Sequence, residues 1–91
     1  MTERVRGLYG IADAGASGGD PLATVRALLA GGCRLVQLRC KGWPVDRIQP
    51  VAEQALALCE ARDATFVLND DPALAARIGA HGVHLGQGDM P

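Results

Sequence analysis

A chain of 91 residues with a net charge of −1 is long enough for one small domain, and it has no basic excess that would favour nucleic acid or an anionic membrane. Apolar residues make up 48% of the sequence but aromatic residues only 3%, so any core must come from Ala, Val, Leu and Ile. We see no apolar run long enough for a membrane span and no basic-then-apolar signal peptide, and we expect neither.

The first predicted elements are a strand, a loop and a helix. Residues 8–12 (LYGIA) are typical of a short strand, and the glycine-rich residues 15–19 of a loop. Asp20-Pro21 predicts the start of a helix, because Asp is a good N-cap and Pro is favoured at the first helical position. Gly31-Gly32 ends that helix, and a second strand covers residues 35–39.

The second helix reaches to about Ala61, but the sequence leaves its start open. Asp46 with Gln49 resembles a capping box. Pro50 would then lie one turn inside the helix, where it removes a backbone hydrogen bond, so Pro50 is the alternative first residue.

A third strand, a third helix and a fourth strand follow in the same order. Residues 65–68 (TFVL) predict the strand, Asp71-Pro72 repeats the Asp-Pro helix start, and Gly79 ends the helix. Residues 82–85 (GVHL) predict the last strand. The order βαβαβαβ indicates an α/β fold with a parallel sheet and right-handed crossovers.

The run VQLRCKG places Gln37, Arg39 and Lys41 at alternate positions. Residues two apart in a strand point the same way, so one face would carry an amide, a guanidinium and an ammonium group. Both cations could be surface charges at a strand end. We favour an anion site, because cations on an otherwise apolar strand are costly unless an anion meets them, and both groups suit phosphate oxygens.

Polar residues also follow the other predicted strands, at the edge where parallel α/β folds build their sites. We assign Asp71 as the N-cap of the third helix, which leaves Asp70 available as a ligand, while Asn69 could be a turn residue. Asp89 either binds a ligand or caps a helix that begins at Met90-Pro91. Two carboxylates beside phosphate-binding cations suit Mg²⁺, so we expect Asp70 and Asp89 to hold that ion.

Two further residues near these strand ends have more than one interpretation. His84 alternates with Val83 and Leu85, so it faces away from the helices. We interpret it mainly as an inward, hydrogen-bonded structural residue, with a catalytic role as the alternative. Tyr9 either lines the site or fills the interior.

The three cysteines, Cys33, Cys40 and Cys59, have no CxxC spacing. We expect no disulfide framework and no zinc site, and these cysteines fit a reducing cytosol better than an oxidising compartment. Small core residues are the simplest interpretation of Cys33 and Cys59.

These motifs resemble the thiamine-phosphate synthase (thiamine phosphate pyrophosphorylase) family along nearly the whole chain: LYGIAD, then QLRCK, then FVLNDD, then GVHLGQGDMP. The resemblance implies a (β/α)8 TIM barrel and a cytoplasmic Mg²⁺-dependent transferase. Such an enzyme joins hydroxymethylpyrimidine diphosphate to a thiazole phosphate and releases pyrophosphate. The resemblance assigns Gln37 to the pyrimidine end of the diphosphate substrate. It assigns Arg39, Lys41 and Asn69 to the diphosphate, and Asp70 and Asp89 to Mg²⁺.

Two departures from the family follow from the sequence. Cys40 stands where the family usually has Glu, and strand parity points it away from the Gln37 face. Residues 1–91 also supply only about four of eight strands, as one partial barrel domain with an open edge at residues 82–85. We therefore expect little activity from this chain alone, and instability, self-association or pairing with a second half-barrel.

Two other functions remain open at this point. One is a thiazole tautomerase of the same superfamily, whose members tend to lose the QLRxK and paired-Asp motifs. The other is a non-catalytic module that binds diphosphate and magnesium.

Overall fold

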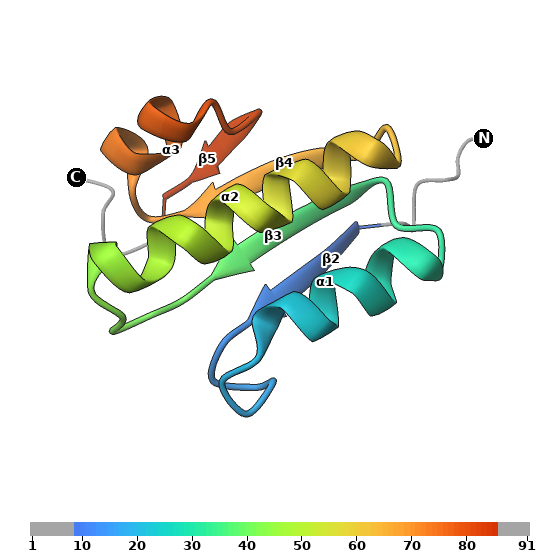
Figure 1. Ribbon diagram of the computed structural model, residues 1–91, viewed down its shortest axis with the longest axis horizontal. Coiled ribbons are helices and arrows are strands. Elements are labelled where there is room, and N and C mark those ends of the chain that lie inside the picture. The colour runs from blue at the N-terminus through green and yellow to red at the C-terminus, as the bar shows by residue number, and fades with distance from the viewer. Residues whose placement is uncertain (1–8, 86–91) are drawn as a thin grey trace.

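The computed structural model describes residues 9–85, which form a four-stranded parallel sheet with three helices on one side of it (Figure 1). The strands lie in chain order, β2-β3-β4-β5, and a helix separates each strand from the next. The elements are β2 (Tyr9–Asp13), α1 (Pro21–Ala30), β3 (Leu35–Arg39), α2 (Val45–Ala61), β4 (Thr65–Asn69), α3 (Pro72–Ile78) and β5 (Gly82–His84). This confirms the predicted βαβαβαβ order.

Both Asp-Pro sequences start helices, as predicted. The Asp20 carboxylate accepts a hydrogen bond from the Ala23 N–H at 3.2 Å, and the Asp71 carboxylate accepts one from the Leu74 N–H at 2.9 Å. Each bond satisfies an N–H group that the first helical turn leaves without a partner. At the other end of α3, Gly79 takes a left-handed conformation with φ 79°, which glycine adopts at little cost.

Helix α2 begins at neither predicted residue. It starts at Val45, after Pro44 in an extended conformation, and the Pro44 carbonyl accepts two N–H groups of the first turn at 3.0 and 3.1 Å. Asp46 is therefore not the N-cap but lies inside the first turn, where its negative charge interacts favourably with the helix dipole. Pro50 is inside the helix, where it costs one backbone hydrogen bond that the rest of this 17-residue helix outweighs.

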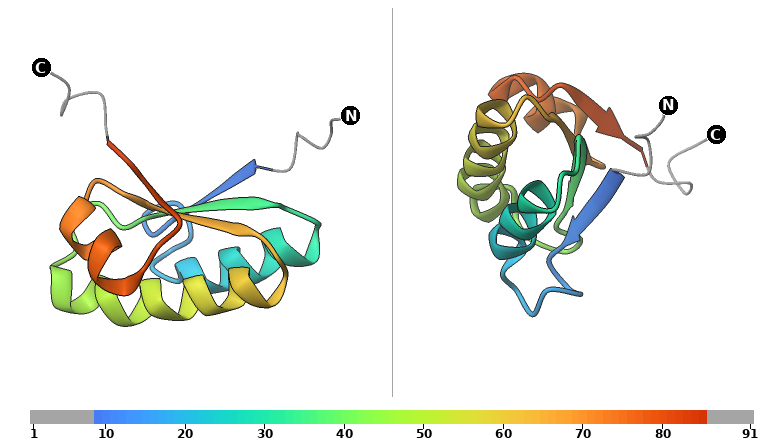
Figure 2. Two further views of the ribbon diagram at one scale, coloured as in Figure 1. Left: turned by 90° about the horizontal axis from the view of Figure 1, so that it is seen from above. Right: turned by 90° about the vertical axis from the view of Figure 1, so that its right-hand side faces the viewer.

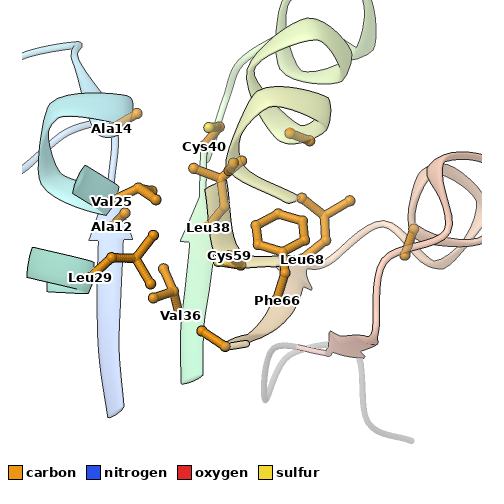
Figure 3. Packing of buried hydrophobic residues seen from close by; sticks show 14 of the residues in the cluster. Ala12, Ala14, Val25, Leu29, Val36, Leu38, Cys40, Cys59, Phe66 and Leu68 are labelled. Atoms are coloured by element: carbon orange, nitrogen blue, oxygen red, sulfur yellow. The ribbon is translucent and has the colours of Figure 1, made fainter. Parts of the chain in front are cut away.

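The core lies between the sheet and its helices (Figure 3). Val36 and Leu38 of β3 and Phe66 and Leu68 of β4 alternate with residues that face the other way, and all four are at most 2% exposed. Fifteen of residues 9–85 form this buried cluster, and Phe66 is the one aromatic residue among these fifteen. Alanine and branched aliphatic side chains thus supply most of the buried surface, as the composition predicted.

Gly10 of β2 lies against the side chain of Leu28 of α1. A Cβ atom added at Gly10 would lie 2.7 Å from a methyl group of Leu28, so the Leu28 side chain would have to move to accept a larger residue. Glycine at this position lets the strand and the helix approach closely.

The face of the sheet opposite the helices carries no helix of the described residues (Figure 2). Within residues 9–85, β2 and β5 each pair with one neighbour only. The two edges hold four of the five large exposed apolar side chains of that part of the chain: Tyr9, Ile11, Val83 and Leu85. The same residues include no helix long and apolar enough to cross a membrane.

Candidate functional site

Strand register brings polar residues into one row at the carboxyl ends of the strands. Asp13 is the register partner of Arg39, and Asn69 is the partner of His84. Pairing of Leu38 with Leu68 places Arg39 beside Asn69 on neighbouring strands. Because Leu38 and Leu68 are buried under the helices, this row lies on the opposite, helix-free face.

Gln37 connects this row to the start of the first strand. Its side-chain N–H group donates to the Tyr9 hydroxyl at 2.7 Å, and its carbonyl oxygen accepts from the Asn69 amide at 2.8 Å. Gln37 is 3% exposed and is the only buried polar residue among those described. Tyr9, at 52% exposure, lines the helix-free face rather than filling an interior. A satisfied amide of this kind holds Asn69 and Tyr9 in fixed orientations.

Arg39 forms an ion pair that sequence analysis missed. Its Nη1 atom lies 2.7 Å from Oδ2 of Asp13 across the β2–β3 pair. The hydrogen bond from Arg39, together with those from the Ala16 and Gly15 N–H groups, holds the pKa of the Asp13 carboxyl below its usual value. The signal was present in the sequence, since Asp13 ends a strand that pairs in parallel with the strand that Arg39 ends.

Lys41 lies beyond the last residue of β3, so strand alternation alone does not orient it. It lines a pocket of about 210 Å³ together with Asn69 and Asp70. Trp43 of the β3–α2 connection and Val45 and Ile48 of the first turn of α2 form an apolar wall of this pocket. Asn69 contacts Gln37 and also lines the pocket, so it connects the residue predicted for the pyrimidine end with the pocket that contains Lys41.

Asp70 has a left-handed backbone with φ 66°, and its N–H donates to the His84 carbonyl at 2.7 Å. Its neighbour Asp71 caps α3, as predicted, so the two carboxylates have separate roles. The second predicted magnesium ligand, Asp89, lies outside the described residues. Within residues 9–85 no three His, Cys, Asp or Glu side chains are grouped as metal ligands, so the magnesium site stays a prediction.

The two histidines have different environments. The exposed His84 shares a row with Asn69, but no hydrogen bond joins its ring to another of residues 9–85, so our structural interpretation gains no support. His81 has that structural role instead. Its Nδ1 atom accepts the Phe66 N–H at 2.8 Å, and its Nε2 atom lies 3.2 Å from a carboxylate oxygen of Glu60.

Cys40, the departure from the family motif, points away from the polar face as predicted. It is 7% exposed and packs in the core, where burial raises its pKa to about 11. Cys59 is fully buried, Cys33 is partly buried against the core, and all three thiols are free. Cys40 also lines the pocket that Lys41, Asn69 and Asp70 line, so the Glu-to-Cys difference changes the wall of this pocket rather than the Gln37 face.

Comparison with known proteins places this geometry in a family. The sequence model described as "Thiamine monophosphate synthase" matches residues 8–91. The chain is 50% identical over 90 residues to the thiamine-phosphate synthase of Thioalkalivibrio sulfidiphilus, covering 98% of this chain and 43% of that protein. It is 49% identical to the enzyme of Marinobacter nauticus, covering 91% of this chain and 38% of that one.

A solved structure shows the same arrangement of strands and helices. The thiamine phosphate pyrophosphorylase from Pyrococcus furiosus superposes with a TM-score of 0.81 at 30% identity, over 91% of this chain and 40% of that one. The four strands and three helices thus correspond to part of that fold. The chain spans about two fifths of the length of these relatives, and it belongs to the thiamine monophosphate synthase family.

Proposed function

We propose that this chain carries the diphosphate-binding part of a thiamine-phosphate synthase. The reaction joins hydroxymethylpyrimidine diphosphate to a thiazole phosphate and yields thiamine phosphate and pyrophosphate. The observation that carries the proposal is the pocket at the carboxyl ends of β3 and β4, which Lys41, Asn69 and Asp70 line together. Parallel α/β folds bind phosphorylated ligands at this edge.

The reaction breaks the bond between the pyrimidine methylene carbon and the leaving diphosphate, and the thiazole nitrogen then attacks that carbon. Negative charge grows on the pyrophosphate as it leaves. We place the leaving diphosphate between Arg39, which Asp13 holds, and Lys41, which lines the pocket, so that both cations stabilise the transition state more than the bound substrate. Asn69 donates a hydrogen bond to the diphosphate, and Gln37 with the Tyr9 hydroxyl meets the pyrimidine end.

Magnesium fits the donor set at this edge of the sheet. Asp70 follows β4 beside Lys41 in the pocket, and a carboxylate oxygen is the ligand that this ion prefers. We assign the ion to Asp70 and Asp89 together with substrate phosphate oxygens. When bound, Mg²⁺ would neutralise part of the charge on the leaving group.

A calorimetric titration with hydroxymethylpyrimidine diphosphate and Mg²⁺ tests the proposal. We expect saturable binding, weakened roughly tenfold or more by Arg39→Ala, because the variant removes charge-assisted hydrogen bonds. Arg77→Ala is the matched control, since Arg77 is an exposed arginine on α3 that bonds to Gln49. No binding by the unchanged chain, or equal weakening by both variants, would refute the assignment.

Turnover is not the best readout for this chain. The relatives are more than twice its length, and we propose that the thiazole phosphate binds to parts of the barrel that these 91 residues lack. We also propose a cytoplasmic location, because three free thiols suit a reducing compartment.

We further propose that two copies of this chain associate through β2 and β5. The apolar side chains of Ile11 and Val83 are 47% and 40% exposed on these edge strands. Strand β5 of one copy can pair in parallel with β2 of the other, and a two-fold axis makes both joints identical. Eight strands would then close into a barrel without open edges.

A further inference from the structure

We propose that Asp13 is a positioning residue, which aims the Arg39 guanidinium at the diphosphate and so strengthens anion binding. The inference rests on the proposed diphosphate site. It concerns a carboxylate that would be expected, from its charge alone, to repel the same ligand.

The two carboxylate oxygens of Asp13 have separate partners. Oδ1 accepts the Gly15 N–H at 2.8 Å and the Ala16 N–H at 3.3 Å, which ties the side chain to the loop after β2. Oδ2 lies 2.7 Å from Nη1 of Arg39. The loop after β2 therefore fixes the Asp13 carboxylate in the position from which it contacts Arg39.

Backbone pairing between β2 and β3 also fixes the position of Arg39 relative to Asp13. Asp13 and Arg39 are register partners at the ends of β2 and β3, and the Ala14 N–H donates to the Arg39 carbonyl at 2.8 Å. Both ends of the ion pair are thus fixed to the same two strands. A guanidinium held this way cannot turn toward solvent without breaking a short charge-assisted bond.

The ion pair leaves most of the arginine available. A guanidinium has five N–H donors in a planar fork, and the contact with Asp13 uses one nitrogen. The side chain of Arg39 is 36% exposed, so donors remain open to a ligand on the helix-free face. An arginine that is already ordered loses less conformational freedom when phosphate binds.

Charge and positioning predict opposite signs for the same variant. If Asp13 acted through its charge alone, Asp13→Asn would remove a repulsion and tighten the binding of magnesium pyrophosphate. If Asp13 instead orients Arg39, Asp13→Asn weakens the binding of magnesium pyrophosphate. Asparagine keeps the oxygen that accepts from the Gly15 and Ala16 N–H groups, so the loop is preserved.

The experiment is a calorimetric titration of the 91-residue chain with pyrophosphate and Mg²⁺. We expect Asp13→Asn to raise the dissociation constant roughly five- to tenfold, the loss of one oriented charge-assisted contact. Asp13→Glu restores the carboxylate and should recover part of the affinity. Asp63→Asn is the control, because it makes the same charge change at an exposed residue before β4, at the far end of the sheet.

A second pair of variants tests whether Asp13 acts through Arg39. Arg39→Lys keeps the charge but loses the fork, and in that background Asp13→Asn should change the affinity less than about twofold. An equal loss in both backgrounds, or unchanged or tighter binding by Asp13→Asn alone, would overturn the inference and leave the diphosphate site intact. Failure of the unchanged chain to bind pyrophosphate would instead overturn the site and the inference together.

Discussion

The polar residues of β3 and its following turn use their side chains in different ways. Gln37 is buried and bonded on both sides within the chain, whereas Arg39 is ion-paired but partly open. Lys41 lies in the pocket beyond the strand and is the only lysine of the chain. We therefore propose that anion binding at this site depends on Arg39 and Lys41, while Gln37 holds Tyr9 and Asn69 in place.

Sequence alternation placed Gln37 and Arg39 on one face of their strand but did not show which residues they contact. The period of two separated Gln37 and Arg39 from Val36 and Leu38, and the structure has that separation. The Asp13–Arg39 pair depends on the register between two strands, which one strand's pattern does not contain. The magnesium ligands remain predicted because Asp89 lies outside the described residues.

Burial should make two of the three thiols slow to react. The pKa values of Cys40 and Cys59 are raised to about 11, chiefly by desolvation. At pH 8 only about one thiol in a thousand would then be a thiolate, the reactive form. With an aromatic disulfide reagent we expect one fast thiol, Cys33, and two slow ones. Modification rates followed by mass spectrometry test this, and fast labelling of Cys40 in the folded chain would contradict it.

The same pKa shifts have a consequence for stability at high pH. A thiol that ionises near pH 9 in the unfolded chain and near 11 in the folded chain favours folding fully below pH 9. As pH rises from 9 to 11, the unfolded chain releases these protons first, so the free energy of unfolding falls. Urea denaturation at pH 8 and pH 10 checks the sign, and higher stability at pH 10 would contradict it.

Element starts were predictable where one residue controls them. Asp20 and Asp71 each supply a side-chain acceptor before a proline, and both helices begin there. The start of α2 was missed because Pro44 has no side-chain acceptor to cap the helix. Its backbone carbonyl instead accepts the N–H groups of the first turn. Packing of a long amphipathic helix on the sheet then outweighs the bond lost at Pro50.

His81 fastens β4 to the chain segment before β5 and to α2. The His81 ring accepts a hydrogen bond from the backbone N–H of Phe66, and the backbone N–H of His81 donates to the Phe66 carbonyl at 3.0 Å. His81→Ala should lower the free energy of unfolding by about 1–3 kcal/mol, because it leaves a backbone N–H in the core without a partner. His84→Ala is the control and should cost less than about 0.5 kcal/mol, since that ring is exposed. Urea denaturation of both variants tests the assignment, and equal losses would contradict it.

Within residues 9–85, the sheet has two edge strands, β2 and β5, and one face that no helix covers, and we therefore expect the chain to associate (Figure 2). Light scattering should show a dimer whose fraction rises with concentration. Ile11→Lys places a charge on β2 and should shift the equilibrium to monomer. Val45→Lys changes a similarly exposed branched aliphatic residue on α2 and should leave the dimer intact. A monomer with a sharp thermal transition at all concentrations would contradict this proposal.

We propose above all that the carboxyl ends of β3 and β4 hold a magnesium diphosphate. Because Lys41 is the only lysine, reductive methylation with ¹³C-formaldehyde labels one side chain besides the terminal amine and keeps its charge. We predict that the NMR signal of Lys41 shifts saturably when pyrophosphate and Mg²⁺ are added together, and less with either alone. A Lys41 signal that stays unchanged when both are present in large excess would contradict the account.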